Sequence, residues 1–190
     1  MKIGVLALQG AFREHCWMLE RSGVTAVEIR KPSELDDIAG LIIPGGESTT
    51  IGKLMVQWGL MEKIQARGIQ GMAIYGTCAG MIMLAKEIIG SDQPRLGLMD
   101  VAVRRNGFGR QRESFEVTML VPEFGTEPVQ AVFIRAPYIE SAGDNVKVLA
   151  IAHDKIVIAR QGKLLVTAFH PELTDDDRIH KYFISMINEK

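Results

Sequence analysis

A glycine–x–cysteine–x–glycine segment constrains the fold of this chain more than any other feature. Residues 76–80 (GTCAG) follow the short apolar run 72–75 and precede a run with helical character at 81–85. Glycines, which have no Cβ, allow the backbone to turn sharply between a strand and a helix. Such a turn places the Cys78 side chain at a sheet end and over a helix N-terminus, where the helix dipole favours a thiolate. The pattern is a nucleophile elbow, and it predicts an enzyme with a cysteine nucleophile.

The first half of the chain alternates between strand-like and helix-like segments. The segments with strand character are short apolar runs at residues 2–8, 24–29, 41–43 and 72–75. Between them, apolar residues recur at helical spacing over residues 11–22 and 49–68, and the second of these segments is predicted to be one long helix. This alternation is typical of a parallel sheet that is covered by helices on both faces.

After Gly90 the pattern changes to strands without intervening helices. Three apolar runs of this kind lie at residues 98–103, 115–121 and 129–134. We expect these strands to pair antiparallel, with a further hairpin at Gln161 and Gly162 and a last helix after the acidic segment 174–177. The expected fold is therefore α/β, a single domain over residues 1–190 with a mostly parallel central sheet, flanking helices and added antiparallel strands.

Composition excludes several classes of protein. A chain of 190 residues, 47% of them hydrophobic, suits one well-buried domain. The 22 Lys and Arg against 23 Asp and Glu give no basic surface for nucleic acid, and no apolar run approaches the roughly 18 residues of a membrane span. Cys16 and Cys78 form no metal-like cluster, so we expect no metal. We also expect no cofactor. Because a disulfide would consume the nucleophile, we expect reduced thiols in the cytoplasm.

A cysteine nucleophile requires a base and a group that orients the base. The candidates are His170 and Glu172, which flank Pro171 and follow the apolar run 164–169. Because Pro171 disfavours helical geometry at His170, we expect an extended segment in which residues two apart project to the same side. The imidazole would then face the thiol, with the Glu172 carboxylate behind it as in a catalytic triad.

An oxyanion hole is expected next to the nucleophile. Gly45 and Gly46 follow the apolar run 41–43 and precede a helix, so their N–H groups can turn toward a ligand without an intervening Cβ. The ends of neighbouring parallel strands meet at one edge of a sheet, which brings this loop to Cys78. The predicted oxyanion donors are the N–H groups of Gly45, Gly46 and Ala79.

These segments carry a family resemblance. Residues 44–49, 76–80 and 170–172, in this order, resemble the class I (triad) glutamine amidotransferases. Further segments are similar to the glutaminase subunits of pyridoxal 5′-phosphate synthase: residues 8–10, 13–15, 105–111, 114–116, 133–137 and 169–174. The resemblance runs from near residue 3 to near residue 185 and covers almost the whole chain.

The resemblance implies hydrolysis of L-glutamine to L-glutamate and ammonia through a glutamyl thioester. It implies Cys78 as the nucleophile, His170 as the base and Glu172 as the partner of the base. The glutamine-binding residues that it implies are Gly46, Glu47, Ser48, Arg105, Ile134 and Arg135. The ammonia would pass to a separate synthase subunit that builds pyridoxal 5′-phosphate (vitamin B6), and the oxyanion loop of such glutaminases is inactive until the synthase docks.

Other functions are compatible with parts of the sequence. Another thiol enzyme of the same architecture, such as a related thiol hydrolase or the glutaminase of a different amidotransferase, would share the triad. A regulatory subunit that binds glutamine without turnover is disfavoured, because all three triad residues are present. Dinucleotide binding is excluded, because Gln9 and Gly10 after the first predicted strand are not part of a Gly-x-Gly-x-x-Gly motif.

Several residues also have a structural interpretation. Cys16 is expected to be an inert residue on the apolar side of a helix, and Ser48 can cap a helix N-terminus. The histidines interpreted as structural or surface residues are His15, His153 and His180. Contact with a partner is the alternative for His15 and Gln9. The arginines that compete with Arg105 for the substrate are Arg104, Arg110 and Arg112.

Overall fold

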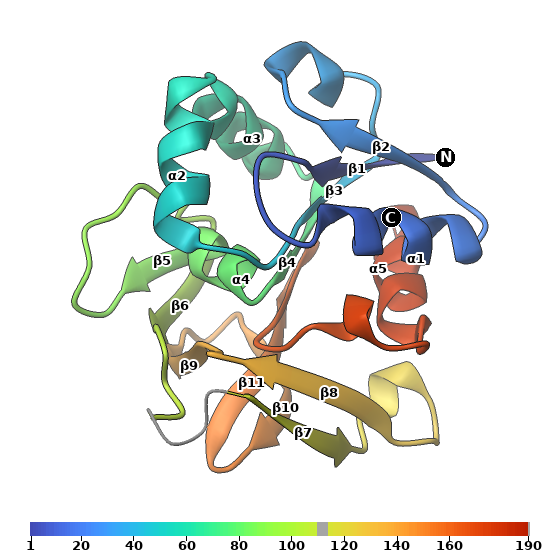
Figure 1. Cartoon of the computed structure of the whole chain (residues 1–190), viewed down its shortest axis with the longest axis vertical. Coiled ribbons are helices and arrows are strands. Elements are labelled where there is room, and N and C mark those ends of the chain that lie inside the picture. The colour runs from blue at the N-terminus through green and yellow to red at the C-terminus, as the bar shows by residue number, and fades with distance from the viewer. Residues whose placement is uncertain (110–113, 190) are drawn as a thin grey trace.

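Four N-terminal apolar runs and one near the C-terminus form the parallel half of a ten-stranded sheet in the computed structural model, which describes residues 1–109 and 114–189 (Figure 1). In spatial order the strands are β2 (Thr25–Ile29), β1 (Lys2–Leu6), β3 (Gly40–Ile43), β4 (Ala73–Thr77) and β12 (Leu164–Thr167). Each strand pairs parallel with its neighbour. Strands β3 and β4 are buried along their whole length, as continuous apolar runs predict for strands covered on both faces.

The other half of the sheet is mixed. Beyond β12 the order continues through β11 (Lys155–Gln161), β9 (Tyr138–Ala142), β6 (Met99–Arg104) and β5 (Ala85–Ile88), and β10 (Lys147–Ala152) pairs with β11. The predicted hairpin between β11 and β12 is confirmed. The expected antiparallel pairing of residues 98–103 is correct only toward β9, because the other neighbour is the parallel strand β5, which the sequence pattern does not predict. A separate antiparallel pair consists of β7 (Ser114–Met119) and β8 (Val129–Ile134).

Helices cover both faces of the parallel strands. They are α1 (Phe12–Arg21), α2 (Ser48–Gln57), α3 (Leu60–Ile69), α4 (Ala79–Leu84) and α5 (Arg178–Asn188). In Figure 1, α2, α3 and α4 lie on one side of β3 and β4, and α1 and α5 lie on the other. Short 3₁₀ turns lie at Pro32–Leu35, Pro122–Phe124 and Pro171–Leu173. Within the described ranges, every helix is too short or too polar to cross a membrane.

The α/β fold is confirmed, with one correction among the helices. The single long helix expected over residues 49–68 is wrong, because α2 ends at Gln57 and α3 begins at Leu60. Between them Gly59 has a φ of 69°, a left-handed conformation that ends a helix. Apolar residues of both helices pack into the same core, so their spacing in the sequence resembles that of one helix.

Strand register brings the candidate site residues to one edge of the sheet. Ile43 at the end of β3 pairs with Gly76, and Thr77 at the end of β4 pairs with Thr167. Because the three strands β3, β4 and β12 are parallel, the residues that follow them leave the sheet at the same carboxyl edge. The loop with Gly45 and Gly46 (the glycine loop), the elbow and the segment with His170 therefore meet there.

Candidate active site

The backbone at Cys78 has the strained conformation of a nucleophile elbow. Its φ is 47° and its ψ is −100°, outside the regions that a residue with a side chain ordinarily adopts. Its N–H donates to Thr167 O at 2.8 Å, which ties the elbow to β12. A Cβ on Gly76 would lie 2.5 Å from the Gly80 carbonyl carbon, and a Cβ on Gly80 would collide with Ile43 O. Both glycines thus permit a close backbone approach that any side chain would prevent.

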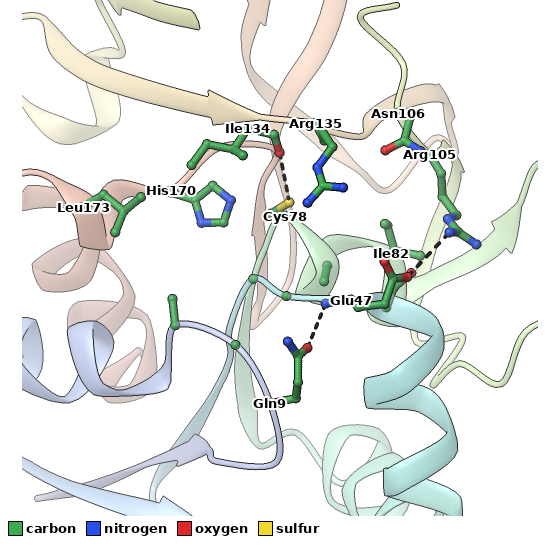
Figure 2. A pocket seen from close by; sticks show the side chains of 16 residues that line it. Gln9, Glu47, Cys78, Ile82, Arg105, Asn106, Ile134, Arg135, His170 and Leu173 are labelled. Atoms are coloured by element: carbon green, nitrogen blue, oxygen red, sulfur yellow. Dashed lines mark hydrogen bonds and ion pairs between the residues drawn. The ribbon is translucent and has the colours of Figure 1, made fainter. Parts of the chain in front are cut away.

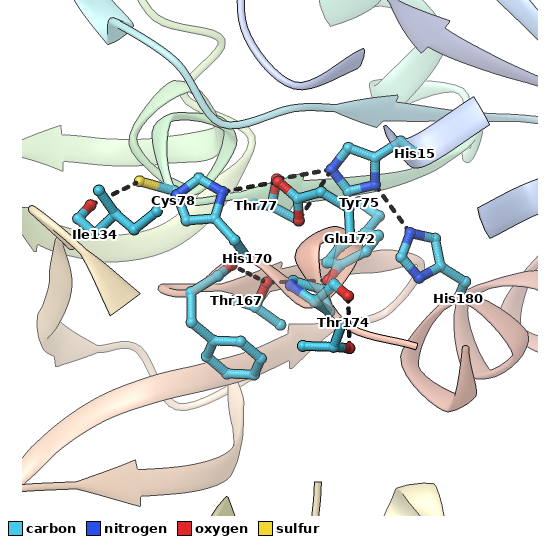
Figure 3. A network of polar contacts seen from close by, with 12 residues as sticks. His15, Tyr75, Thr77, Cys78, Ile134, Thr167, His170, Glu172, Thr174 and His180 are labelled. Atoms are coloured by element: carbon cyan, nitrogen blue, oxygen red, sulfur yellow. Dashed lines mark hydrogen bonds and ion pairs between the residues drawn. The ribbon is translucent and has the colours of Figure 1, made fainter. Parts of the chain in front are cut away.

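His170 and Glu172 form a buried pair beside Cys78 (Figure 3). His170 Nδ1 lies 2.7 Å from Glu172 Oε1. The two residues are only 8% and 5% exposed. The extended segment expected here is wrong, because Pro171–Leu173 is a 3₁₀ turn whose first position suits the fixed φ of proline. The turn still brings both side chains to the same side.

The His170 ring is held in its protonated form. Burial opposes the charge, but hydrogen bonds to Cys78 and Glu172, together with the charges of both groups, raise the pKa of His170 from 6.5 to about 10. At neutral pH the ring is therefore an imidazolium, and its charge lies beside the Cys78 sulfur. Because Nδ1 is occupied by the carboxylate, Nε2 is the ring nitrogen left for Cys78.

A cavity of about 400 Å³ opens over Cys78 (Figure 2). Its lining includes every residue predicted to bind glutamine or to stabilise an oxyanion: Gly45, Gly46, Glu47, Ser48, Ala79, Arg105, Ile134 and Arg135. Cys78 and His170 line it as well, whereas Glu172 lies behind the His170 ring. The other lining residues, for which no substrate contact is predicted from the sequence, are Gln9, Gly10, Ala11, Ile82, Asn106 and Leu173.

The glycine loop packs directly against the loop that follows β1. Gly45 O accepts a hydrogen bond from Ala11 N–H at 3.1 Å, and Glu47 N–H donates to Gln9 Oε1 at 2.8 Å. On its other side the loop touches the histidine, since a Cβ on Gly45 would collide with His170 Cε1. The loop is thus held between the β1 loop and the His170 ring, at the floor of the cavity.

Gln93, a residue not predicted from the sequence, joins two of the predicted glutamine-binding residues. Its Oε1 accepts from Arg105 Nη1 at 2.9 Å and from Ser48 Oγ at 3.3 Å. Its Nε2 is buried and has no hydrogen-bond partner among the described residues. Arg105 Nη2 also lies 3.6 Å from Glu47 Oε1. Gln93 lies in an irregular segment after β5, where neither periodicity nor a motif marks it.

Of the three arginines that compete with Arg105 for the substrate, only Arg104 lies within the described residues. Arg104 Nε donates to Glu140 Oε2 at 2.9 Å, and Arg104 is not among the residues that line the cavity. Arg110 and Arg112 lie outside the described residues, as does Gln111 at the end of the segment 105–111. Among the described arginines of this segment, Arg105 is the one that reaches the cavity.

The structure also tests three structural interpretations. Ser48 is not the helix cap, because the cap of α2 is Glu47, whose side chain accepts from Thr49 N–H. Cys16 is half-buried, and burial raises the pKa of its thiol to about 11, as expected for an inert cysteine. His15 is wholly buried, so its alternative placement in a partner contact is wrong.

Comparison with known proteins decides the family. The SNO glutamine amidotransferase family matches residues 5–189 of the chain. This chain belongs to the SNO glutamine amidotransferase family. The match covers both halves of the candidate site, the elbow and the segment with His170 and Glu172. It confirms the resemblance to glutamine amidotransferases that the sequence motifs indicate.

Two curated relatives resemble the chain over nearly its whole length. The protein of Moorella thermoacetica named pyridoxal 5′-phosphate synthase subunit PdxT is 62% identical over 187 residues, which are 98% of this chain and 100% of that protein. The protein of the same name from Brevibacillus brevis is 60% identical over 189 residues, which are 100% of this chain and 98% of that protein.

Solved structures agree with this placement. A crystal structure of a glutamine amidotransferase has a TM-score of 0.94 at 50% identity and covers 98% of this chain and 99% of its own. The structure of PurLQS from Thermotoga maritima has a TM-score of 0.69 at 15% identity, with 97% of each chain covered. At 15% identity, the similarity to PurLQS shows a shared fold and nothing about function.

Proposed function

We propose that the chain is the glutaminase subunit of a pyridoxal 5′-phosphate synthase. The observation that carries the proposal is the strained Cys78 beside a protonated His170, at the floor of a cavity that every predicted glutamine-binding residue lines. The relatives named as subunits of this synthase support the choice of pathway, because they match over nearly their entire length.

The proposed reaction is an acyl transfer through the sulfur. The Cys78 thiolate attacks the side-chain amide carbon of glutamine, and the carbonyl oxygen becomes an oxyanion. His170 then gives its proton to the amide nitrogen, the carbon–nitrogen bond breaks, and ammonia leaves a glutamyl thioester. In the second half, neutral His170 takes a proton from water, which attacks the thioester and releases glutamate and the thiolate. Glu172 keeps the His170 ring oriented throughout.

We assign the oxyanion to backbone donors. Ala79 is the first residue of α4, so its N–H has no acceptor within the helix and lies beside the nucleophile. The glycine loop supplies the other donors, Gly45 and Gly46. Because Gly45 O is bonded to Ala11 N–H, the loop has a fixed orientation that a docking partner can change through the β1 loop. Such a change would suit a glutaminase that works only with its synthase.

The cavity offers charges that match free glutamine. The α-carboxylate of glutamine suits the guanidinium groups of Arg105 and Arg135, since arginine binds carboxylates in a bidentate manner. The α-ammonium group suits the Glu47 carboxylate on the same wall. Ser48 and Ile134 complete the proposed glutamine site, and Ile134 O faces Cys78 Sγ at 4.0 Å.

The ammonia is proposed to pass to a synthase subunit that docks on this chain. Free ammonia is mostly protonated at neutral pH and is then not a nucleophile, so a sheltered transfer to a partner is chemically useful. The two free cysteines agree with a reducing compartment, and we propose the cytoplasm as the location.

The first test is glutamate release from L-glutamine by the purified chain, with and without the synthase subunit of a relative. We expect turnover that appears or rises sharply when the synthase subunit is added. Absence of turnover in both conditions, with Cys78 still reactive toward an alkylating reagent, would contradict the proposal. Turnover that a different ammonia-accepting subunit raises instead would assign the chain to another amidotransferase.

Replacement of Gln93 tests the glutamine site at a residue outside the catalytic chemistry. We expect Gln93→Leu to raise KM for glutamine about tenfold, because Arg105 loses a hydrogen bond to a charged group, which typically contributes about 1.5–3 kcal/mol. The value of kcat should stay within about threefold. Steady-state kinetics of the complex measure both. Gln65→Leu is the matched control, since Gln65 donates to Leu96 O outside the cavity, and an equal rise of KM in both variants would contradict the assignment.

A further inference from the structure

A second group of buried polar side chains lies behind the triad (Figure 3). His15 and His180 are both fully buried, and His15 Nδ1 lies 2.9 Å from His180 Nε2. The other ring nitrogen, His15 Nε2, lies 3.4 Å from Glu172 Oε2 and 3.1 Å from Thr77 Oγ1. The two histidines therefore continue the line of the triad into the core, at residues that the proposed reaction does not use.

The outer oxygen of Glu172 needs a hydrogen-bond donor. Oε1 is occupied by His170 Nδ1, whereas Oε2 is buried and has no hydrogen bond among the described residues. A buried carboxylate oxygen without a donor is costly, and the nitrogen placed to supply a proton is His15 Nε2. Hydrogen bonds of catalytic groups are often long before substrate binds and shorten in the reacting complex.

The carboxylate also decides where the protons of the two rings lie. Since an ionised carboxylate only accepts, a donor for Glu172 Oε2 requires the proton on His15 Nε2. In this tautomer Thr77 Oγ1, at 3.1 Å, acts as an acceptor, and His15 Nδ1 accepts from His180 Nε2–H. His180 Nδ1, which has no partner in the described part of the chain, is left without a proton. The opposite arrangement would bury an unpaired N–H on His180 and point a lone pair of His15 at the Glu172 carboxylate, and both are unfavourable.

Both rings are neutral at neutral pH. The pKa of His15 lies well below 6.5, mainly because the ring is buried and to a smaller extent because the rings of His180 and His170 are close to it. Burial lowers the pKa of His180 to about 4, although the negative charges of Asp177 and Asp176 act to raise it. The two neutral rings therefore act on Glu172 through the position of their protons and not through a charge.

We infer that His15, with its tautomer fixed by His180, is a positioning residue that donates to Glu172 Oε2 and holds the carboxylate against His170. The inference rests on the proposed glutaminase function. Without this donor the Glu172 carboxylate can rotate about its last side-chain bond, and His170 loses the partner that fixes its ring. Loss of an outer hydrogen-bond partner of a metal-bound ligand typically lowers metal affinity or activity about 10–100-fold. We expect loss of the His15 donor to lower kcat by a similar factor.

Two polar substitutions of His15 test the inference in the complex with the synthase subunit. The amide nitrogen of glutamine reaches about as far as the ring Nε2, whereas that of asparagine reaches only the position of Nδ1. We expect His15→Asn to lower kcat about 10–100-fold with KM unchanged, and His15→Gln to keep most of the activity. Equal values of kcat in the two variants would overturn the inference.

The Glu172→Gln background separates positioning from a structural role. There His15→Asn should lower kcat less than about threefold, because no carboxylate is left for His15 to hold. A loss of the same size in both backgrounds would show that His15 acts on the fold in general, and it would overturn the inference.

Ring nitrogen-15 chemical shifts of the wild-type chain test the proton arrangement without substrate or partner. We expect the Nε2-protonated tautomer for both His15 and His180 at neutral pH. An Nδ1-protonated His15 would overturn the inference even if the chain is a glutaminase. If the expected tautomers occur in a chain that never hydrolyses glutamine, the arrangement is supported and the proposed function alone fails.

Discussion

The Cys78→Ala variant should release no measurable glutamate from L-glutamine, even when the synthase subunit is present. Without the sulfur no glutamyl thioester can form, and loss of a triad nucleophile typically lowers kcat by about 10⁴–10⁶-fold. The measurement is glutamate release by the purified complex, with wild type and variant at equal concentration. Because the change removes one sulfur from a residue that is 7% exposed, the fold and the docking surface should be retained.

The other cysteine provides the matched control. Cys16 is half-buried on α1 and is absent from the cavity lining, so Cys16→Ala should keep full activity. Co-sedimentation with the synthase subunit should show that both variants still form the complex. Glutamate release by Cys78→Ala at more than about 1% of the wild-type rate would falsify the thioester mechanism.

His170→Asn should lower kcat more than Glu172→Gln. The first variant removes the group that takes and gives the proton, which typically lowers kcat by about 10⁴–10⁶-fold. The second keeps the imidazole and removes the charge that orients it and stabilises its protonated form, for which we expect about 10²–10⁴-fold. Single-turnover glutamate release measures both losses. The reverse order would mean that the two roles are wrongly assigned.

The pH dependence of Cys78 alkylation tests the charge of His170 without the glutaminase reaction. The pKa of His170 is raised to about 10, so its charge is present throughout the neutral range and is lost only as the pH rises through about 10. At neutral pH we therefore expect iodoacetamide to alkylate Cys78 faster in the wild type than in His170→Asn, which lacks the imidazolium charge beside the sulfur. The difference between the two proteins should disappear as the pH rises through about 10, where the wild-type ring loses its charge. Cys16, whose pKa is about 11, is the unreactive reference in both proteins.

The parts of the site that could be predicted are local in the sequence. The elbow depends on Gly76 and Gly80 within two residues of Cys78, because only glycine leaves room for the backbone to pass so closely at both positions. His170 and Glu172 are only two positions apart in the chain. Their pairing is therefore predicted correctly, although the segment is a 3₁₀ turn and not extended as expected. Their catalytic roles stay predictions until the substitutions above are measured.

The sequence by itself determined the α/β class, the family and the segments that meet at the sheet edge, because hydrophobic periodicity and short motifs are local properties. Only the tertiary structure decided that α2 and α3 are separate helices, that Gln93 joins Ser48 to Arg105, and that His15 lies against Glu172. His15 and His180 are 165 positions apart in the chain. Contacts of that range depend on strand register and on the packing of helices against the sheet, which no local pattern of residues encodes.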